Sequence, residues 1–356
     1  MFTLIKDSEK TKMKKILITG ASGYIGKHIT LQLLNEGYEV RASVRNLTKS
    51  LEVKNAVLPY LIDLSNIDSR LTFVELDLNK DSGWDAALQD IDLLMHTASP
   101  FPLAKPKDEN ELTRPAVEGT LRALNAAKRA GVNRVIITSS VAAVWGFDLP
   151  VEKSELDETM WTDINHPLGK ETYNKSKTLA ESAAWNFIKN SAPEISLTTI
   201  NPVIVLGAPL DDKFGTSVSL IDRFMKGRDP MLPDINMSIV DVRDVAFMHV
   251  QAIKIEATKG ERILAASESM PAVGVTQYLK SIYPKSKIKT AKAPNFLIKF
   301  IALFDAEIKS VLPMLGRPFN VNNAKAKRLF NIEFISAKES IRDTADYLLK
   351  NGYLKM

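Results

Sequence analysis

The sequence of 356 residues contains no cysteine and only four histidines. Without cysteine, disulfide bonds, thiolate metal ligands and a cysteine nucleophile are all excluded. The histidines, at positions 28, 96, 166 and 249, show none of the spacings that metal sites use, so we expect no bound metal. We expect structural roles for His96 and His166.

Long apolar runs are also missing. The longest candidate, NFLIKFIALF at 295–304, is shorter than a membrane span and contains Lys299. The first residues, MFTLIKDSEKTKMKK, lack the apolar core of a secretory signal. The net charge of +5 is spread along the chain and forms no basic face. We therefore expect a cytoplasmic protein that acts on a small molecule, with neither nucleic acid nor membrane as its partner.

In its first 205 residues the chain alternates between short apolar strands and amphipathic helices. Strands are predicted at 15–19, 39–44, 71–76, 92–97, 134–139 and 195–200, and helices near 24–35, 50–58, 82–88, 111–131 and 172–190. Strands that alternate with helices form right-handed βαβ units around a parallel sheet. The predicted fold class is therefore α/β, with a Rossmann-type doubly wound parallel sheet.

After residue 205 the alternation loosens into short helices and proline-containing loops. We expect a flexible extension at 1–13, a dinucleotide-binding Rossmann domain at 14–205, and a smaller mixed α/β lobe at 206–356 that mainly binds substrate. The apolar block at about 238–253 is predicted to return to the Rossmann layer. The amphipathic stretch 295–312 is compatible with a partner or membrane-surface helix, and we favour a helix that covers the substrate lobe.

The segment TGASGYIG at 19–26 places three glycines between the first strand and the first helix. Gly20, Gly23 and Gly26 allow a tight turn and let a pyrophosphate approach the backbone, while the helix start offers free N–H groups. A glycine turn that follows a strand and opens a helix is the context that dinucleotide binding requires.

The second strand indicates which dinucleotide is bound. NAD-binding chains carry an acidic residue about 20 residues beyond the glycines, and this chain has none there. Arg45 ends the strand, with Lys49 downstream, and an arginine at this place can pair with a 2′-phosphate. We therefore expect NADPH/NADP⁺ rather than NAD(H). Asp77, after the third strand, either accepts from the adenine amino group or sits in a surface turn.

Two Tyr-x-x-x-Lys patterns compete for the role of proton donor, YNKSK at 173–177 and YPKSK at 283–287. Tyr173 and Lys177 lie in a helical sequence without proline, where residues four apart share one face. Tyr283 precedes Pro284, and a residue before proline is pushed away from helical angles. Tyr173 is therefore the candidate, and we expect the Lys177 ammonium to lower its pKa from about 10 toward neutrality.

The fifth strand ends in two serines, Ser139 and Ser140. Ligands of a parallel sheet bind beyond the carboxyl ends of its strands. Either serine could therefore hydrogen-bond a substrate carbonyl and orient it toward Tyr173.

These segments together resemble the extended short-chain dehydrogenase/reductase superfamily, and within it the branch of plant dihydroflavonol and cinnamoyl-CoA reductases and yeast methylglyoxal/carbonyl reductases. The resemblance rests on TGASGYIG, VRASVRN, HTASPF, VIITSSVAAV, YNKSKTLAESAAW, NPVIVLG and DVRDVA, which keep the family's order from about residue 15 to 250. It covers the rest of the chain only loosely.

The resemblance implies a Ser-Tyr-Lys mechanism with NADPH. In it Ser140 orients the carbonyl, Tyr173 donates the proton and Lys177 is its electrostatic partner. The implied cofactor shell contains Gly20, Ser22, Gly23, Tyr24, Ile25, Arg45, Asp77, Leu78, Thr97, Ala98, Pro202 and Val203, to which we add Gly26, Lys49, Ser139, Tyr173 and Lys177.

Two departures from the resemblance narrow the substrate. The helix at 111–131 has no clear counterpart of the asparagine common in nucleotide-sugar members. Trp145 stands where plant flavonoid reductases carry a substrate-binding asparagine. Both departures argue against those substrate classes.

We therefore predict an NADPH-dependent reductase of aldehydes or ketones, present as a monomer or homodimer. An NAD-dependent nucleotide-sugar epimerase or dehydratase and a catalytically silent NADP-sensing protein are the alternatives. The residues predicted to line an apolar substrate pocket are Phe101, Trp145, Trp161 and Phe214, with Trp145 foremost.

Overall fold

The structure is a computed structural model that describes residues 14–100 and 108–354. The predicted extension at 1–13 and the pocket candidate Phe101 lie outside the described residues. Among the described residues, no helix combines the length and apolar character needed to cross a membrane.

Seven parallel strands form the larger sheet, in the order β3-β2-β1-β4-β5-β6-β9. Their bounds are β1 (Lys15–Thr19), β2 (Glu39–Val44), β3 (Leu71–Glu75), β4 (Leu93–His96), β5 (Arg134–Thr138), β6 (Ser196–Pro202) and β9 (Arg262–Ala265). The register sets Ile16 beside Val40 on one side and Leu93 on the other. This arrangement confirms the predicted Rossmann-type sheet.

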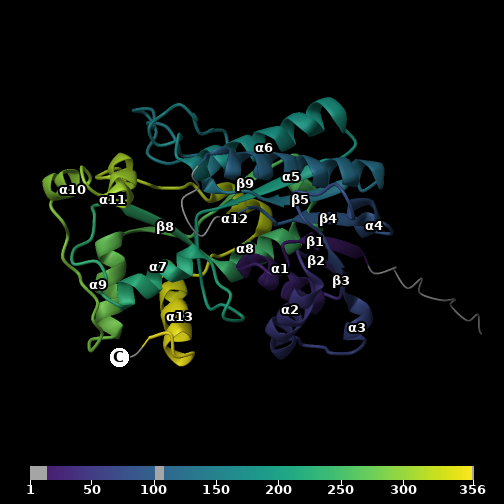
Figure 1. Cartoon of the computed structure of the whole chain (residues 1–356), viewed down its shortest axis with the longest axis horizontal. Coiled ribbons are helices and arrows are strands. Elements are labelled where there is room, and N and C mark those ends of the chain that lie inside the picture. The colour runs from purple at the N-terminus through teal and green to yellow at the C-terminus, as the bar shows by residue number, and fades with distance from the viewer. Residues whose placement is uncertain (1–13, 101–107, 355–356) are drawn as a thin grey trace, which may run out of the picture.

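Side chains that alternate along β1 show how both faces of the sheet are buried. Ile16 and Ile18 belong to one apolar cluster and Leu17 to another. The first cluster includes α1 (Tyr24–Asn35) and α8 (Val242–Gln251), and the second includes α4 (Trp84–Leu88), α5 (Asn110–Arg129) and α6 (Thr172–Ser191). Figure 1 shows α5 and α6 lying side by side over one face. Strands covered on both sides explain why their sequences are almost wholly apolar.

Short helical segments complete this half of the chain. They are α2 (Ser50–Val57), α3 (Ile67–Arg70), and the 3-10 turns η1 (Leu47–Lys49), η2 (Leu58–Tyr60) and η3 (Val141–Ala143). The six strands and five helices predicted for the first 205 residues agree with the structure to within two residues at each end.

A second, smaller lobe lies beside the larger sheet, at the left of Figure 1. Its sheet has the order β10-β8-β7, with β7 (Ile204–Leu206) parallel and β10 (Glu268–Pro271) antiparallel to β8 (Asn236–Asp241). The mixed α/β lobe was predicted. The remaining segments are α7 (Thr216–Met225), η4 (Glu256–Thr258), α9 (Ala272–Ile282), α10 (Asn295–Ile301), α11 (Ala306–Val311), η5 (Leu312–Met314), α12 (Ala324–Phe330) and α13 (Ala337–Lys350).

The block at 238–253 runs from the small sheet to the large one. Strand β8 belongs to the small sheet, and α8, which follows it directly, packs against α1 in the apolar cluster beneath the larger sheet. The domain boundaries drawn from the sequence stay a prediction.

The amphipathic stretch 295–312 is broken into two helices, where one continuous segment was expected. The carboxylate of Asp305 accepts a hydrogen bond from the backbone N–H of Ile308 at 3.1 Å, so Asp305 begins a new helix as an N-cap. Ile308 and Val311 of α11 face a cavity described below, whereas Phe296, Phe300 and Phe304 are exposed.

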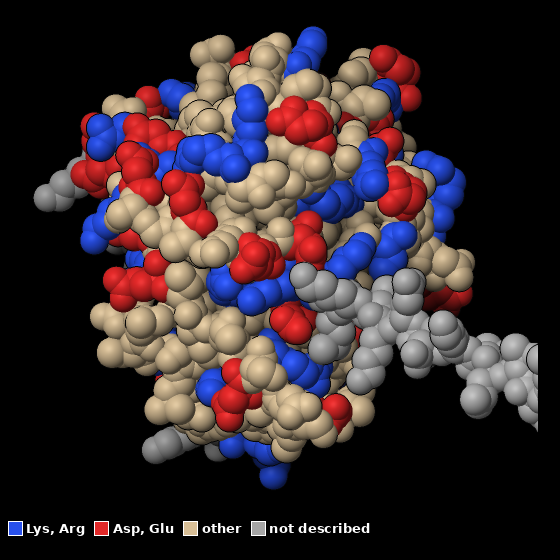
Figure 2. Space-filling model, turned by 90° about the vertical axis from the view of Figure 1, so that its right-hand side faces the viewer, with Lys and Arg blue, Asp and Glu red and all other residues tan. Residues whose placement is uncertain are grey.

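Charged side chains of both signs are interspersed on the face shown in Figure 2. Ion pairs of this kind occur on α5, where Arg129 pairs with Asp85 at 2.7 Å and Arg122 pairs with Glu118 at 3.3 Å. The charges of these two arginines are therefore neutralised locally.

Candidate active site

Helix α6 carries Tyr173, Lys177 and Glu181 at intervals of four residues, so the three side chains share one face. Lys177 and Glu181 are buried. The Lys177 Nζ atom lies 5.7 Å from the centroid of the Tyr173 ring. The predicted pair is thus brought together by one helical turn.

Ser140 completes the group from the end of β5. It hydrogen-bonds Tyr173 through its side chain. Its hydroxyl also accepts from the backbone N–H of Ala142 at 3.1 Å, because Ser140 caps η3. The neighbouring Ser139 points the other way and donates to Glu181 at 2.5 Å. Of the two serines that the sequence left open, Ser140 is the one beside the tyrosine.

Glu181 is a buried carboxylate that the sequence analysis missed. It accepts hydrogen bonds from Ser139, from the Asn201 amide at 2.6 Å and from the Arg262 Nε at 2.6 Å. Thr199 and Trp185 add longer bonds, at 3.1 and 3.3 Å. A buried charge is tolerated only when it is paired and hydrogen-bonded in this way. The sequence signal that could have revealed Glu181 was its position four residues after Lys177, on the same face of the helix.

The pKa values of the pair differ from the expectation. Burial raises the pKa of Tyr173, and the hydrogen bond with Ser140 only partly opposes this. Burial also lowers the pKa of Lys177 to about 8, against the attraction of Glu181. The expected lowering of the tyrosine pKa is therefore wrong. Desolvation is the largest cause of both shifts, and it outweighs the electrostatic help that the spacing of the two residues suggested.

The glycine turn is compact enough to exclude side chains. Gly20 has φ +72°, and a Cβ there would lie 2.8 Å from the Ala98 backbone. A Cβ on Gly26 would lie 2.2 Å from the Gly20 carbonyl oxygen. Gly23 caps α1 without any side-chain hydrogen bond, and the first turn of α1 carries no acidic residue. The free N–H groups and positive end of α1 therefore suit a pyrophosphate.

Residues at the ends of the neighbouring strands surround this turn. Arg45 is exposed after β2 and forms no ion pair with any described residue, whereas Lys49 pairs with Glu52 at 2.8 Å. The Asp77 carboxylate accepts from the Asn79 backbone N–H at 2.9 Å, which is the turn geometry weighed as an alternative. Thr97 donates to the Thr19 carbonyl at 2.6 Å and so holds the β4 end against β1.

Tyr24 contributes its backbone to the turn, and its side chain points elsewhere. The hydroxyl donates to the carbonyl of Gly207 at 2.8 Å, toward the smaller lobe. The other shell residues lie at the turn or at strand ends, namely Ser22 and Ile25 beside the glycines, Leu78 after β3, Ala98 after β4, and Pro202 and Val203 at the end of β6.

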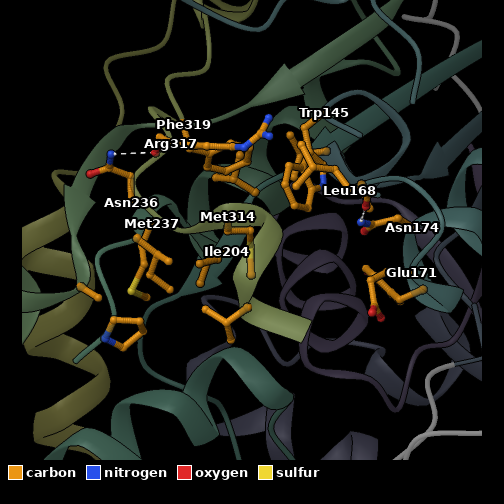
Figure 3. Close-up of a pocket in the computed structure, with 18 of the residues that line it drawn as sticks. Trp145, Leu168, Glu171, Asn174, Ile204, Asn236, Met237, Met314, Arg317 and Phe319 are labelled. Carbon is orange, nitrogen blue, oxygen red and sulfur yellow. Dashed lines mark hydrogen bonds between the residues drawn. The ribbon is translucent and has the colours of Figure 1, made fainter. Parts of the chain in front are cut away.

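A cavity of about 990 Å³ opens between the two lobes, with Ser140 and Tyr173 in its wall. Trp145 lines it and packs edge-to-face on Phe319 with ring centroids 5.4 Å apart. Figure 3 shows Glu171 and Asn174 on one side, Met237 on the opposite side, and Ile204 and Met314 between them. The cavity thus joins the carboxyl edge of the large sheet to the small lobe.

The pocket candidates Trp161 and Phe214 lie outside this cavity. The Arg262 guanidinium covers the Trp161 ring at 3.7 Å, so that ring belongs to the support of Glu181. Phe214 packs on Tyr353 with ring centroids 5.3 Å apart. Tyr283, from the second Tyr-x-x-x-Lys pattern, ends α9 and donates to Asp346, away from the cavity.

Several cavity residues carried no sequence signal because they lie in segments without a motif. They are Met237, Met314, Arg317 and Phe319, whereas Asn174 lies inside the YNKSK motif and Glu171 two residues before it, where only Tyr173 and Lys177 were singled out. The described residues hold no group of three or more histidines, aspartates or glutamates placed to bind a metal.

A parallel Rossmann sheet, a glycine turn and a Tyr-x-x-x-Lys helix beside a serine at the carboxyl edge are the features of an extended short-chain dehydrogenase/reductase. The NAD dependent epimerase/dehydratase family matches residues 16–266, and the chain belongs to this family.

Its relatives include reductases. Cinnamoyl-CoA reductase 1 of Arabidopsis thaliana is 32% identical over 96% of this chain and 91% of its own length. A ketoreductase of Aspergillus niger is 33% identical over 86% of this chain and 94% of its own. The crystal structure of the yeast methylglyoxal/isovaleraldehyde reductase complexed with NADPH superposes with a TM-score of 0.77 at 28% identity, covering 96% and 100% of the two chains.

The glycine turn yields a test of backbone packing. Gly26→Ala should destabilise the protein by about 1–3 kcal/mol, because its Cβ would strike the Gly20 carbonyl. Gly274→Ala is the matched control, since Gly274 is likewise the third residue of a helix and has only ordinary contacts. There the free energy of unfolding should rise by up to about 1 kcal/mol. Denaturant titration of both variants would show opposite signs, and equal effects would contradict the proposed crowding.

The buried lysine yields a test of stability against pH. Burial lowers the pKa of Lys177 from 10.5 to about 8. Below pH 8 the lysine is charged in both the folded and the unfolded state, so its burial costs folding free energy there. Lys177→Met should therefore raise the free energy of unfolding at pH 7 by up to about 3 kcal/mol. The unfolded chain binds more protons between pH 8 and 10.5, so wild-type stability rises with pH and the advantage of the variant shrinks. Lys175→Met, which removes a surface pair with Glu109, should change stability by less than about 1 kcal/mol at every pH.

Proposed function

We propose that the protein reduces an aldehyde or ketone to an alcohol with NADPH, with Ser140, Tyr173 and Lys177 as its catalytic residues. The observation that carries the proposal is their convergence. Ser140 and Tyr173 hydrogen-bond each other in the wall of a large cavity, and Lys177 lies beneath the tyrosine. The reductase relatives support the same reaction class.

The glycine turn and the strand ends suit NADPH. Gly20, Gly23 and the start of α1 would hold the pyrophosphate. Arg45, which is exposed and forms no ion pair within the described part of the chain, would take the 2′-phosphate. No acidic side chain stands at that place to favour a ribose hydroxyl. When bound, NADPH supplies a hydride to the carbonyl carbon.

The three side chains divide the remaining work. Ser140 hydrogen-bonds the carbonyl oxygen and directs it toward the phenol. Tyr173 donates its proton to that oxygen as the carbon is reduced, which completes the hydroxyl group. A phenol with a raised pKa is fully protonated at neutral pH, so it starts in the form that reduction needs.

Lys177 stabilises the state that follows the proton transfer. The tyrosinate is a buried anion, and the nearby ammonium reduces the cost of forming it. With a pKa of about 8, Lys177 is mostly charged at neutral pH. Glu181, paired with Arg262, lies one turn further along α6 and attracts the ammonium from the side away from the cavity.

The test is NADPH oxidation, followed at 340 nm, over a panel of aldehydes, diketones and ketoesters. Tyr173→Phe should lower kcat by about 10²–10⁴-fold, the usual contribution of a positioned acid, while NADPH still binds. Tyr283→Phe, from the second Tyr-x-x-x-Lys pattern, serves as the matched control and should keep wild-type activity. Undiminished turnover by Tyr173→Phe would refute its role as donor. Absence of turnover on every carbonyl would sink the proposal and turn attention to nucleotide sugars.

A further inference from the structure

The cavity is much larger than the group that reacts in it. Its volume of about 990 Å³ is near the upper end for small-molecule sites. Ser140 and Tyr173 occupy only one part of its wall, and a carbonyl group needs no more than their immediate surroundings. The part of the cavity beyond the carbonyl and the nicotinamide is therefore available to the substituent that the carbonyl carries.

The wall beyond the reacting end is apolar. From Glu171 and Asn174, which flank Tyr173 in the chain, the cavity continues past Ile204 and Met314 to Met237 in the small lobe (Figure 3). Further apolar residues line it, among them Leu220, Phe224, Leu232, Val311 and Phe319. Such a lining favours a chain of methylene or aromatic groups, because burial of apolar surface drives binding.

The charged groups of the cavity wall are distributed unevenly. Arg223 pairs with Asp229 at 2.6 Å, and Arg317 pairs with Asp148, so neither arginine is an unopposed cation. Glu171 lies two residues before Tyr173 and forms no ion pair or hydrogen bond through its side chain with any described residue. A substrate carboxylate close to the reacting carbonyl would therefore meet a like charge.

We infer that the substrate is an uncharged aldehyde or ketone with an extended apolar substituent. Its carbonyl lies against Ser140 and Tyr173, and its substituent runs past Met314 and Ile204 toward Met237. This inference rests on the proposed function and specifies its substrate class. Two features of the cavity carry it, the apolar length of the wall and the Glu171 carboxylate, which has no ion-pair partner among the described residues.

The apolar length predicts a steep dependence on chain length. Each methylene group that the cavity buries should raise kcat/KM about three- to fourfold, until the cavity is filled. Straight-chain aldehydes from propanal to decanal test this directly. The expected result is a rise over several carbons followed by a plateau.

Met314 lies midway along the cavity and offers the matched variant. Met314→Trp should narrow the passage and reduce the ratio of kcat/KM for nonanal over that for butanal at least tenfold. Met314 is half-buried in a short surface segment, so the larger ring has room to be accommodated without unfolding the core. Leu315→Trp is the control, because Leu315 is also half-buried and does not line the cavity. It should keep the wild-type ratio.

The outcomes separate the two proposals. If butanal is reduced but kcat/KM does not rise with chain length, the substrate inference is overturned and the proposed function stands. If Met314→Trp and Leu315→Trp both keep the wild-type ratio, the substituent does not run past Met314, and the inference also fails. If NADPH binds but no carbonyl compound in the series is reduced, the proposed function itself fails.

The Glu171 carboxylate predicts discrimination by charge. The wild type should reduce the ethyl ester of 2-oxooctanoate faster than 2-oxooctanoate itself, by on the order of tenfold in kcat/KM at low salt. Glu171→Gln should bring the ratio of kcat/KM for the ester over that for the acid closer to one. Added salt should do the same in the wild type. Glu194→Gln removes an exposed carboxylate at the far end of α6 and should leave the ratio unchanged. Equal rates for acid and ester in the wild type would overturn the charge argument.

Discussion

The buried carboxylate of Glu181 is the constraint on which the site depends. It lies on α6 beneath Lys177 and receives hydrogen bonds from β5, β6 and β9 through Ser139, Asn201 and Arg262. Removing Arg262 would leave the carboxylate without its ion-pair partner in the protein interior. The helix that presents Tyr173 is thereby fixed in rotation and height against three strands of the large sheet. The same pairing orders Arg262, whose guanidinium covers Trp161.

Tyr173 and Lys177 are two ionisable groups placed together in the protein interior. Burial raises the pKa of Tyr173 and lowers that of Lys177, so each group is pushed toward its uncharged form. The burial of Lys177 opposes stability, because a charged lysine in the protein interior costs folding free energy. The burial of Tyr173 keeps the phenol protonated, which is the form that donates a proton. Functional sites commonly carry local costs of this kind, which the surrounding core offsets.

Much of the fold could be predicted from the sequence because the larger sheet is built from local patterns. Apolar strands such as KILIT and the amphipathic helix at 24–35 are each set by a few neighbouring residues, and the glycine turn joins them. Tyr173 and Lys177 could be chosen over Tyr283 because a proline disrupts helical geometry locally. The cavity could not be predicted from local sequence patterns of this kind. Met237, Met314 and Glu171 are far apart in the sequence and line one cavity only in the folded chain. Trp161 and Phe214 are aromatic residues that pack outside the cavity. The rise in the Tyr173 pKa was missed because it depends on burial, which a spacing pattern does not report.

The face of α6 that carries Tyr173, Lys177 and Glu181 also limits how this helix can change in evolution. Successive residues of a helix are rotated by about 100°, so inserting or deleting a single residue between Tyr173 and Glu181 would turn the tyrosine out of phase with its anchor. Substitutions on the opposite face leave this phase intact. The length of this segment should therefore vary far less among homologues than its surface composition, while insertions gather in the irregular stretch between β5 and α6, where Trp145 and Trp161 lie.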